Sequence, residues 1–205
     1  MVHQQRFAGT GWLPVNAVLR CLTFGRVTLL QLLGLEGAAL RLLDRLCALA
    51  PADVQAREWR MHLLTLAGAW PAALADSEQV LVQRPNHATS WFNHGFLLEH
   101  AEHWDEAAQA FSRATQLDPQ LDRAWYGLGL VHIRQGRLPD ALQALSRNTA
   151  LQPMSPHGWY QLARVQLDLQ QHDAAAQTLR RLLSFDPRVA EQLMQDTGLA
   201  VPAVH

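Results

Sequence analysis

The fold is decided by residues 88–121, ATSWFNHGFLLEHAEHWDEAAQAFSRATQLDPQL, because residues 122–155 repeat their pattern as DRAWYGLGLVHIRQGRLPDALQALSRNTALQPMS. A tryptophan stands at the fourth position of both stretches, and a proline stands near the end of both. Over the whole chain, one series of prolines recurs every 34 residues: Pro51, Pro85, Pro119, Pro153 and Pro187. A fixed period in this range indicates a stack of similar supersecondary units.

Alanines follow the same period, at Ala39, Ala73, Ala107, Ala141 and Ala175. Two apolar runs separated by a turn fill each period, so each unit is predicted to be a helix, a turn and a second helix. The period divides the chain into an arm, five units and a tail: 1–19, the degenerate Leu-rich unit 20–53, then 54–87, 88–121, 122–155 and 156–189, and 190–205 with a capping helix.

Local signals place the helix ends. Gly34 and Gly37 mark the turn of the first unit, and Asp105 and Asp173 are predicted to cap the second helices of their units. A short amphipathic helix is expected to end at Gly198, because glycine commonly follows the last helical residue.

Composition excludes several classes of protein. The net charge of -1 gives no electrostatic footprint for nucleic acid. Two cysteines cannot form a disulfide framework, no secretory signal opens the chain, and charges interrupt the Leu-rich region before it reaches spanning length. We therefore expect a cytoplasmic protein, with membrane association as the alternative.

Candidate reactive residues do not assemble into a catalytic motif. His94, His100 and His103 lie close together, but His94 falls on another helix face and no cysteine lies nearby, so surface histidines are favoured over a metal site. Cys21 and Cys47 lie in apolar helices, where a thiol is expected to be inert. No nucleophile elbow and no phosphate loop occur, so we expect no enzyme, no metal and no cofactor.

The unit Trp91-x2-His94-Gly95-x2-Leu98, with Ala107, Phe111, Ala114 and Pro119, resembles the tetratricopeptide repeat. Units 122–155 and 156–189 carry the same pattern, while three residues depart from it: Arg57, His94 and Asn148. The resemblance implies an all-α, right-handed α-solenoid of about five helix-turn-helix repeats with a C-terminal capping helix. It also implies that the first helices line a concave groove. The family's clamp for chaperone C-termini is disfavoured, because Phe92, Phe96 and Gly127 stand where its Lys, Asn and Arg would.

The resemblance assigns a set of residues to the groove wall: Gln55, Glu58, Trp59, His62, Thr89, Phe92, Asn93, Phe96, Glu99, Arg123, Tyr126, Leu130, Arg134, His157, Tyr160, Gln161, Arg164 and Asp168. The residues expected to bind the partner are Phe92, Asn93, Phe96, Arg123, Tyr126, Arg134, Tyr160 and Arg164. Aromatic and arginine side chains are enriched at the energetic centres of protein interfaces. An acidic and apolar segment of a partner protein would suit such a wall.

The Leu-rich first unit is predicted to dock, because a terminal repeat should carry a polar outer face and this one is apolar. The expected docking residues are Leu29, Leu30, Leu33, Leu42 and Leu46. The leading hypothesis is a non-catalytic scaffold or adaptor that binds a protein segment and docks by this end, as a homo-oligomer or within a larger complex. The alternative is a peripheral membrane-associated assembly factor anchored by the Arg- and Leu-rich N-terminal helices.

Overall fold

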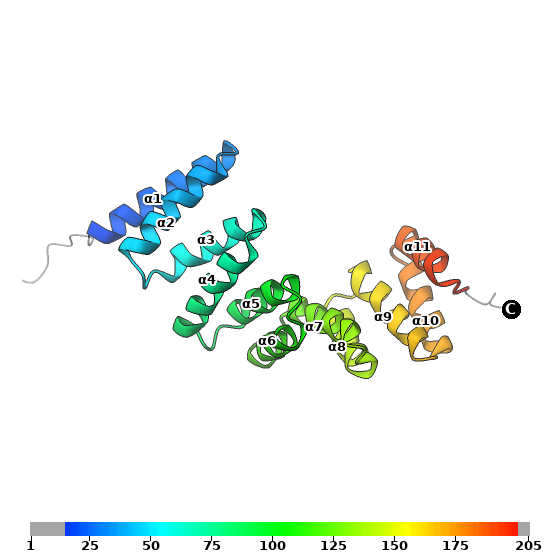
Figure 1. Ribbon diagram of the computed structural model, residues 1–205. Coiled ribbons are helices and arrows are strands. Elements are labelled where there is room, and N and C mark those ends of the chain that lie inside the picture. The colour runs from blue at the N-terminus through cyan, green and yellow to red at the C-terminus, as the bar shows by residue number, and fades with distance from the viewer. Residues whose placement is uncertain (1–14, 201–205) are drawn as a thin grey trace, which may run out of the picture. The chain divides into compact units, whose positions relative to one another are not determined.

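The computed structural model describes residues 15–200, and over this range the chain is all-helical (Figure 1). Its eleven helices are α1 (Val15–Leu32), α2 (Glu36–Leu49), α3 (Val54–Leu66), α4 (Trp70–Gln83), α5 (Ala88–His100), α6 (Trp104–Leu117), α7 (Asp122–Arg134), α8 (Leu138–Leu151), α9 (Pro156–Asp168), α10 (His172–Leu183) and α11 (Pro187–Thr197). The predicted arm 1–19 lies mostly outside the described residues. The helices group into two compact units, one ending at Ala69 and the other beginning at Trp70, and the predicted repeat 54–87 spans this boundary.

The 34-residue period is visible in the backbone. The turn after the first helix of each pair contains one residue with positive φ, always at the same register: Gly34, Gly68, Glu102, Gly136 and Gln170. This left-handed conformation reverses the chain into the second helix. Gly37 lies inside α2, so only Gly34 belongs to the predicted turn.

The prolines and tryptophans of the repeat are joined by hydrogen bonds. The indole Nε1 of Trp91 donates to the carbonyl of Pro85 at 2.8 Å, and Trp125 and Trp159 repeat this bond with Pro119 and Pro153. Arg57, which replaces the tryptophan in its unit, donates instead from Nε to the Pro51 carbonyl at 3.1 Å. Arg57 therefore keeps the hydrogen bond to the proline carbonyl that tryptophan makes in the later repeats.

The first unit buries one face of α1 against α2 and α3. Its core is Val27, Ala39, Leu43 and Leu63, with the Phe24 and Trp59 rings 5.3 Å apart beside it. Asp53 caps α3 by accepting from the Ala56 amide at 3.2 Å, and it also pairs with Arg20 of α1. The cap and the ion pair thus fix the start of α3 against α1.

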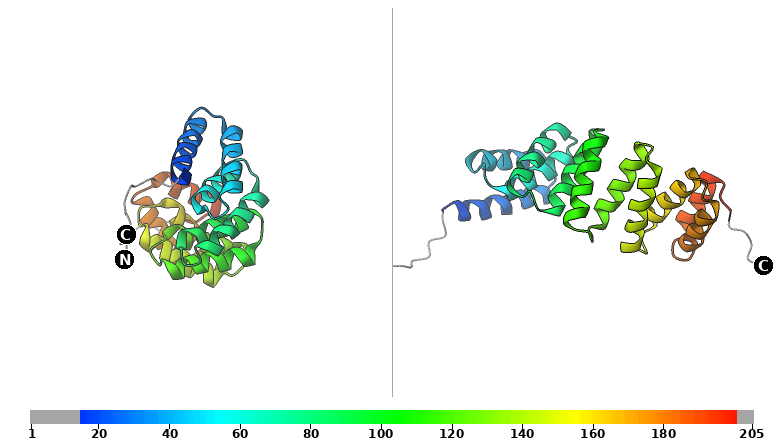
Figure 2. Two further views of the ribbon diagram at one scale, coloured as in Figure 1. Left: turned by 90° about the vertical axis from the view of Figure 1, so that its left-hand side faces the viewer. Right: turned by 90° about the horizontal axis from the view of Figure 1, so that it is seen from below.

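In the second unit, α5 and α6, α7 and α8, and α9 and α10 follow one another as helix pairs (Figure 2). The Phe111 side chain of α6 lies between Gly95 of α5 and Gly127 of α7. A Cβ atom at either glycine would come within 3.0 Å of the ring, so only glycine permits this close packing. Phe111 therefore joins two successive repeats.

Asn148 stands where the repeat ordinarily has a small residue, and the structure shows how its larger polar side chain is accommodated. Its amide Nδ2 donates to the Asp122 carbonyl at 3.0 Å, at the start of α7. Gly158 of α9 provides the space, since a Cβ there would lie 2.2 Å from Asn148 Oδ1. The buried amide is thus paired and accommodated together.

Two predicted caps are wrong. The residues that precede α6 and α10 are His103 and Gln171, and neither makes a side-chain cap bond. Asp105 and Asp173 lie one residue inside the first turn, where a negative charge still interacts favourably with the helix N-terminus. The C-terminal helix ends as expected, with Gly198 in the left-handed conformation at φ 70°.

Candidate functional site

The predicted groove wall brings together side chains of α5 and α7. Phe92 of α5 is half-buried and packs on the core ring of Phe111, with centroids 5.9 Å apart. The guanidinium carbon of Arg123, on α7, lies 5.0 Å from the Phe92 centroid, within cation–π range. Asn93, the next predicted wall residue, is also half-buried in α5. An anchored aromatic ring is therefore flanked by an exposed guanidinium from the next repeat.

A polar cluster continues the wall from α5 through α7 to α9. Burial raises the pKa of Glu99, while His100 and Arg134 lower it. Burial also raises the pKa of Tyr126, while its hydrogen bond with Gln161 lowers that pKa and the Glu99 charge raises it. These neighbours belong to three successive first helices, so the wall is continuous across three repeats.

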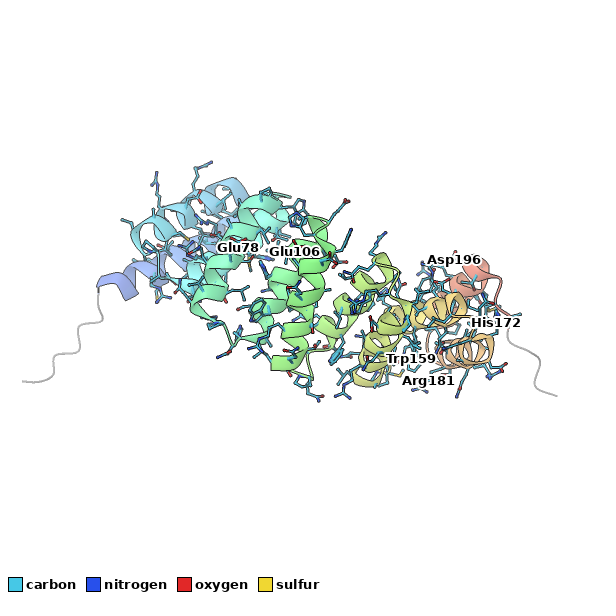
Figure 3. All side chains as sticks on the ribbon, turned by 60° about the horizontal axis from the view of Figure 1, so that its bottom comes forward. Glu78, Glu106, Trp159, His172, Arg181 and Asp196 are labelled. Carbon is cyan, nitrogen blue, oxygen red and sulfur yellow. The ribbon has the colours of Figure 1, made fainter. Side chains whose placement is uncertain are left out.

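At the C-terminal end of the wall, α11 contacts the predicted residue Tyr160. The Tyr160 hydroxyl donates to the carboxylate of Asp196, which lies on α11 (Figure 3). The guanidinium carbon of Arg164 lies 5.8 Å from the Tyr160 centroid. This part of the wall is therefore contacted by the chain's own last helix.

Aromatic side chains also meet at the α4–α5 edge. The His100 ring stacks on Trp70 with centroids 4.6 Å apart and lies 4.2 Å from the predicted wall residue Phe96. Its Nδ1 is 3.0 Å from the Phe96 carbonyl, a geometry in which the ring N–H donates. One repeat later, Arg134 takes the place of His100, and its guanidinium carbon lies 5.9 Å from the Trp104 ring.

His94 is not the surface histidine that the sequence favoured. It is half-buried, and its Nδ1 lies 2.8 Å from the hydroxyl of the buried Ser77. Burial lowers the pKa of His94, while the charge of Glu78, which is labelled in Figure 3, raises it. The imidazole therefore joins α4 to α5 as a structural group.

The candidate metal ligands and the two thiols can be placed in the structure. Within residues 15–200, no three His, Cys, Asp or Glu side chains are grouped to hold a metal ion. Cys47 is buried as expected, but Cys21 is exposed on α1. The apolar helix therefore shields the thiol of Cys47 but not that of Cys21, and the inertness of Cys21 stays a prediction.

The predicted docking leucines separate into two groups. Leu29 and Leu33 are 56% and 62% exposed. Leu46 is buried in the core of its own unit, and Leu30 and Leu42 pack partly against that core. Leu46 is therefore wrong as an accessible docking residue, because its side chain faces inward from α2.

In α1 and the turn after it, three further leucines are exposed and are omitted from the predicted set: Leu22, Leu32 and Leu35. Leu22 lies seven residues before Leu29, a spacing that places both on one side of a helix. That spacing was the available signal. No helix within the described range is both long enough and apolar enough to cross a membrane.

The second unit holds a pocket at α6 and α7 that the sequence did not indicate. It measures about 660 Å³ and is lined by α6, α7 and the turn after α7. Within it, Nδ1 of the buried His132 lies 3.1 Å from Gln135 Oε1, and Gln135 Nε2 donates to Asp105 Oδ1 at 2.8 Å. In the next repeat Gln166 takes the place of His132 and accepts from Thr178. The helical pattern alone could not identify a cavity formed by residues of three elements.

Comparison with solved structures places the fold among known proteins. A fragment of MamA from Desulfovibrio magneticus RS-1 matches with a TM-score of 0.75 and 20% identity, covering 84% of this chain and 95% of that one. YrrB, described as a tetratricopeptide repeat protein with an unusual peptide-binding site, matches at 0.72 and 17%, covering 84% and 90%. PilF of Pseudomonas aeruginosa matches at 0.72 and 16%, covering 89% and 86%. These identities show the fold alone.

No curated protein matches the chain. The sequence profile of the tetratricopeptide repeat matches residues 67–122, 97–150 and 126–190, which together span more than half of the chain. The prediction of an all-α repeat solenoid is confirmed by this match, by the helical architecture and by the solved structures. The chain therefore belongs to the tetratricopeptide repeat family, whose fold is generally a non-catalytic one for protein interaction.

Proposed function

We propose that this protein is a non-catalytic scaffold that binds a segment of a partner protein along the wall formed by α5, α7 and α9. The observation that carries the proposal is the continuity of this wall, in which aromatic and charged side chains of successive first helices contact one another. Repeat proteins use such extended surfaces for binding. YrrB, a structural neighbour, is described as having a peptide-binding site.

The side chains of the wall define the chemistry of the segment. Arg123 and Arg164 are exposed, and their planar donor groups suit carboxylates and backbone carbonyls. Phe92 and Phe96 lie between core and solvent, where they can contact apolar side chains. A segment that alternates acidic and apolar residues fits both features.

A matched pair of variants tests the groove. The test variant carries Arg123→Ala, Arg134→Ala and Arg164→Ala, and the control carries Arg147→Ala, Arg180→Ala and Arg188→Ala, three exposed arginines of the same unit. Partners are captured from native cells, identified by mass spectrometry and then measured with the purified partner segment. We expect the test variant to lose at least about tenfold in affinity, equivalent to about 1.4 kcal/mol, and the control to bind normally. Equal binding by both variants would contradict the groove proposal.

A second role, docking by the N-terminal unit, is favoured by the exposed leucines of α1 and its following turn. Contiguous apolar surface of this kind marks interaction sites in soluble proteins. The membrane alternative is tested by flotation of the full chain with anionic vesicles. We expect the chain to stay in the soluble fraction, since the arginines and leucines of α1 are not segregated on opposite faces.

A further inference from the structure

The α1 helix is apolar on two opposite sides. Val27 and Phe24 face the core of the first unit. The outward side carries Leu22, Leu29 and the end of the helix around Leu32, with exposures of 63%, 56% and 80%. Gly25 and Arg26 lie between Leu22 and Leu29 along the helix. A Cβ added at Gly25 would meet nothing within 4 Å. This outward side is called the α1 face below.

The register of the repeat shows what the α1 face corresponds to. In the four following first helices, the residues at the position of Leu29 are buried: Leu63, Leu97, Val131 and Val165. In three of those repeats, residues of the preceding helix pair cover the position: Ala39 and Leu43 lie with Leu63, Ala110 and Phe111 with Val131, and Ala141 and Leu145 with Val165. The α1 face is therefore a stacking face that lacks its neighbour among the described residues.

The position of Leu22 excludes an ordinary repeat as that neighbour. Its counterparts are small and buried: Ala56, Ser90, Ala124 and Gly158. A small residue there lets the preceding helices approach closely, whereas leucine adds three carbon atoms that would overpack the same contact. The occupant must lie against α1 in another way.

The opposite end of a second copy does not fit either. The outward residues of α11 are polar and exposed: Arg188, Glu191, Gln192, Gln195 and Asp196. Covering leucines with these groups would desolvate them without giving them partners. Head-to-tail stacking of copies is therefore disfavoured.

The α1 face is complementary to itself. If two copies of α1 run antiparallel about a two-fold axis between residues 25 and 26, Leu22 of each lies against Leu29 of the other. Arg26 of each then lies over Gly25 of the other, where the absent side chain leaves room for the arginine stem. The face carries no acidic residue that would require a different partner.

We propose that the protein forms a homodimer through isologous, antiparallel packing of its two α1 faces. The proposal rests on the docking role of the N-terminal unit and specifies its partner as a second copy of this chain. Leu22, Leu29, Leu32, Leu33 and Leu35 are each at least half exposed, and packing of two α1 faces would remove apolar surface of these leucines from water. Two-fold packing also makes both contact surfaces identical, as in most oligomers.

Cysteine crosslinking tests the pairing directly. In a Cys21→Ser background, Leu22→Cys and Leu29→Cys are made separately, mixed, and combined in one chain. The antiparallel dimer predicts a disulfide in the mixture and in the double variant. Each single variant alone should stay uncrosslinked, because its two thiols lie about 10 Å apart along the helix axis. Crosslinking of each single variant with itself would overturn the antiparallel arrangement.

Molar mass by light scattering tests the dimer without cysteine chemistry. At about 100 µM, where a dimer of micromolar Kd is almost fully formed, we expect the mass of two chains. Leu22→Arg and Leu29→Asp should each give monomers, and the double variant Leu22→Arg/Leu29→Asp should dimerise again, because opposite charges then face each other at both contacts. The exposed substitution Gln192→Asp on α11 serves as the control and should remain dimeric.

A monomeric wild type would overturn the homodimer. Binding of the chain to vesicles that the same leucine substitutions abolish would overturn it as well.

The docking role is judged separately from the homodimer. If a monomeric wild type loses a purified cellular partner on Leu29→Asp, docking stands and the partner is a different protein. The groove proposal depends on neither result, because its variants lie in the second unit.

Discussion

The outward sides of α11 and α1, the two end helices of the described array, differ in polarity. In α11, Ala190 and Leu193 are fully buried against the preceding pair, and the outward residues are polar. In α1, the inward residue Val27 is equally buried, but the outward residues include Leu22 and Leu29. The chain itself thus provides a solvated end at α11, while α1 ends in a surface suited to another apolar surface.

The largest effect is expected from breaking the C-terminal end. Leu193→Asp places a charge at a fully buried position among α9, α10 and α11, where the cluster supplies no partner. We expect a loss of about 3–5 kcal/mol in the free energy of unfolding, measured by urea denaturation with circular dichroism. The neighbouring exposed substitution Gln192→Asp is the control and should change stability little. A near-neutral Leu193→Asp would show that α11 does not cap the array.

Truncating Leu97 of α5 and Leu29 of α1, which occupy the same position of the repeat, compares a covered stacking face with an uncovered one. Leu97→Ala removes a side chain that is 2% exposed, so we expect a loss of about 2–5 kcal/mol. Leu29→Ala truncates its exposed counterpart and should cost less than about 1 kcal/mol in dilute samples, where dimers dissociate. Equal losses in denaturant titrations would mean that Leu29 is covered within the monomer.

The position shared by Leu22 of α1 and Ala124 of α7 should give a smaller difference in the free energy of unfolding. Ala124→Leu inserts three carbon atoms at a fully buried site and should destabilise by about 1–3 kcal/mol. The reverse change at the first repeat, Leu22→Ala, should stay within about 0.5 kcal/mol for the monomer. Melting temperatures of both variants check this, and an unaffected Ala124→Leu protein would show that the stacking contact tolerates leucine.

The smallest effect concerns the tie between Tyr160 and Asp196. The hydrogen bond to Asp196 raises the pKa of Tyr160 most, with burial and the Asp196 charge adding and Arg164 opposing. Because the folded pKa lies above the ordinary value of 10.0, the tie stabilises the fold below pH 10 and its contribution is lost as pH rises through the raised pKa. Solvent screening keeps this contribution below about 1 kcal/mol.

The chain has two tyrosines, so ultraviolet titration can follow Tyr160 once Tyr126→Phe removes the other. In that background, Asp196→Asn should lower the pKa of Tyr160 toward its ordinary value. Asp173→Asn, at an exposed aspartate of α10, is the control and should leave it unchanged. An unaltered pKa in Asp196→Asn would contradict the tie between α9 and α11.

The sequence predicted those features that depend on the period. From α3 to α9, the first helix of each pair begins every 34 residues. The period did not show which large side chains lie against Gly95 and Gly129, namely Phe111 and Leu145. Arg57 could be recognised as a departure, but its hydrogen bond to Pro51 could not, since that bond depends on a side-chain conformation.

The Leu-rich first unit shows the limit of periodicity. When nearly every position of a helix is leucine or alanine, the pattern does not distinguish the inward face from the outward one. The pattern therefore predicts Leu46 on the docking surface although it is buried, and it does not single out Leu22 although it is exposed. Which wall residues bind a partner remains a prediction, because the fold positions them without selecting a ligand.

The bonds between tryptophans and prolines give the array a built-in set of spectroscopic reporters. Each of Trp91, Trp125 and Trp159 binds the carbonyl that ends the unit before it, so each indole proton reports on one junction between neighbouring repeats. Exchange of these three protons with deuterium would measure the opening of the array junction by junction. Cooperativity along the solenoid could then be followed without an added label.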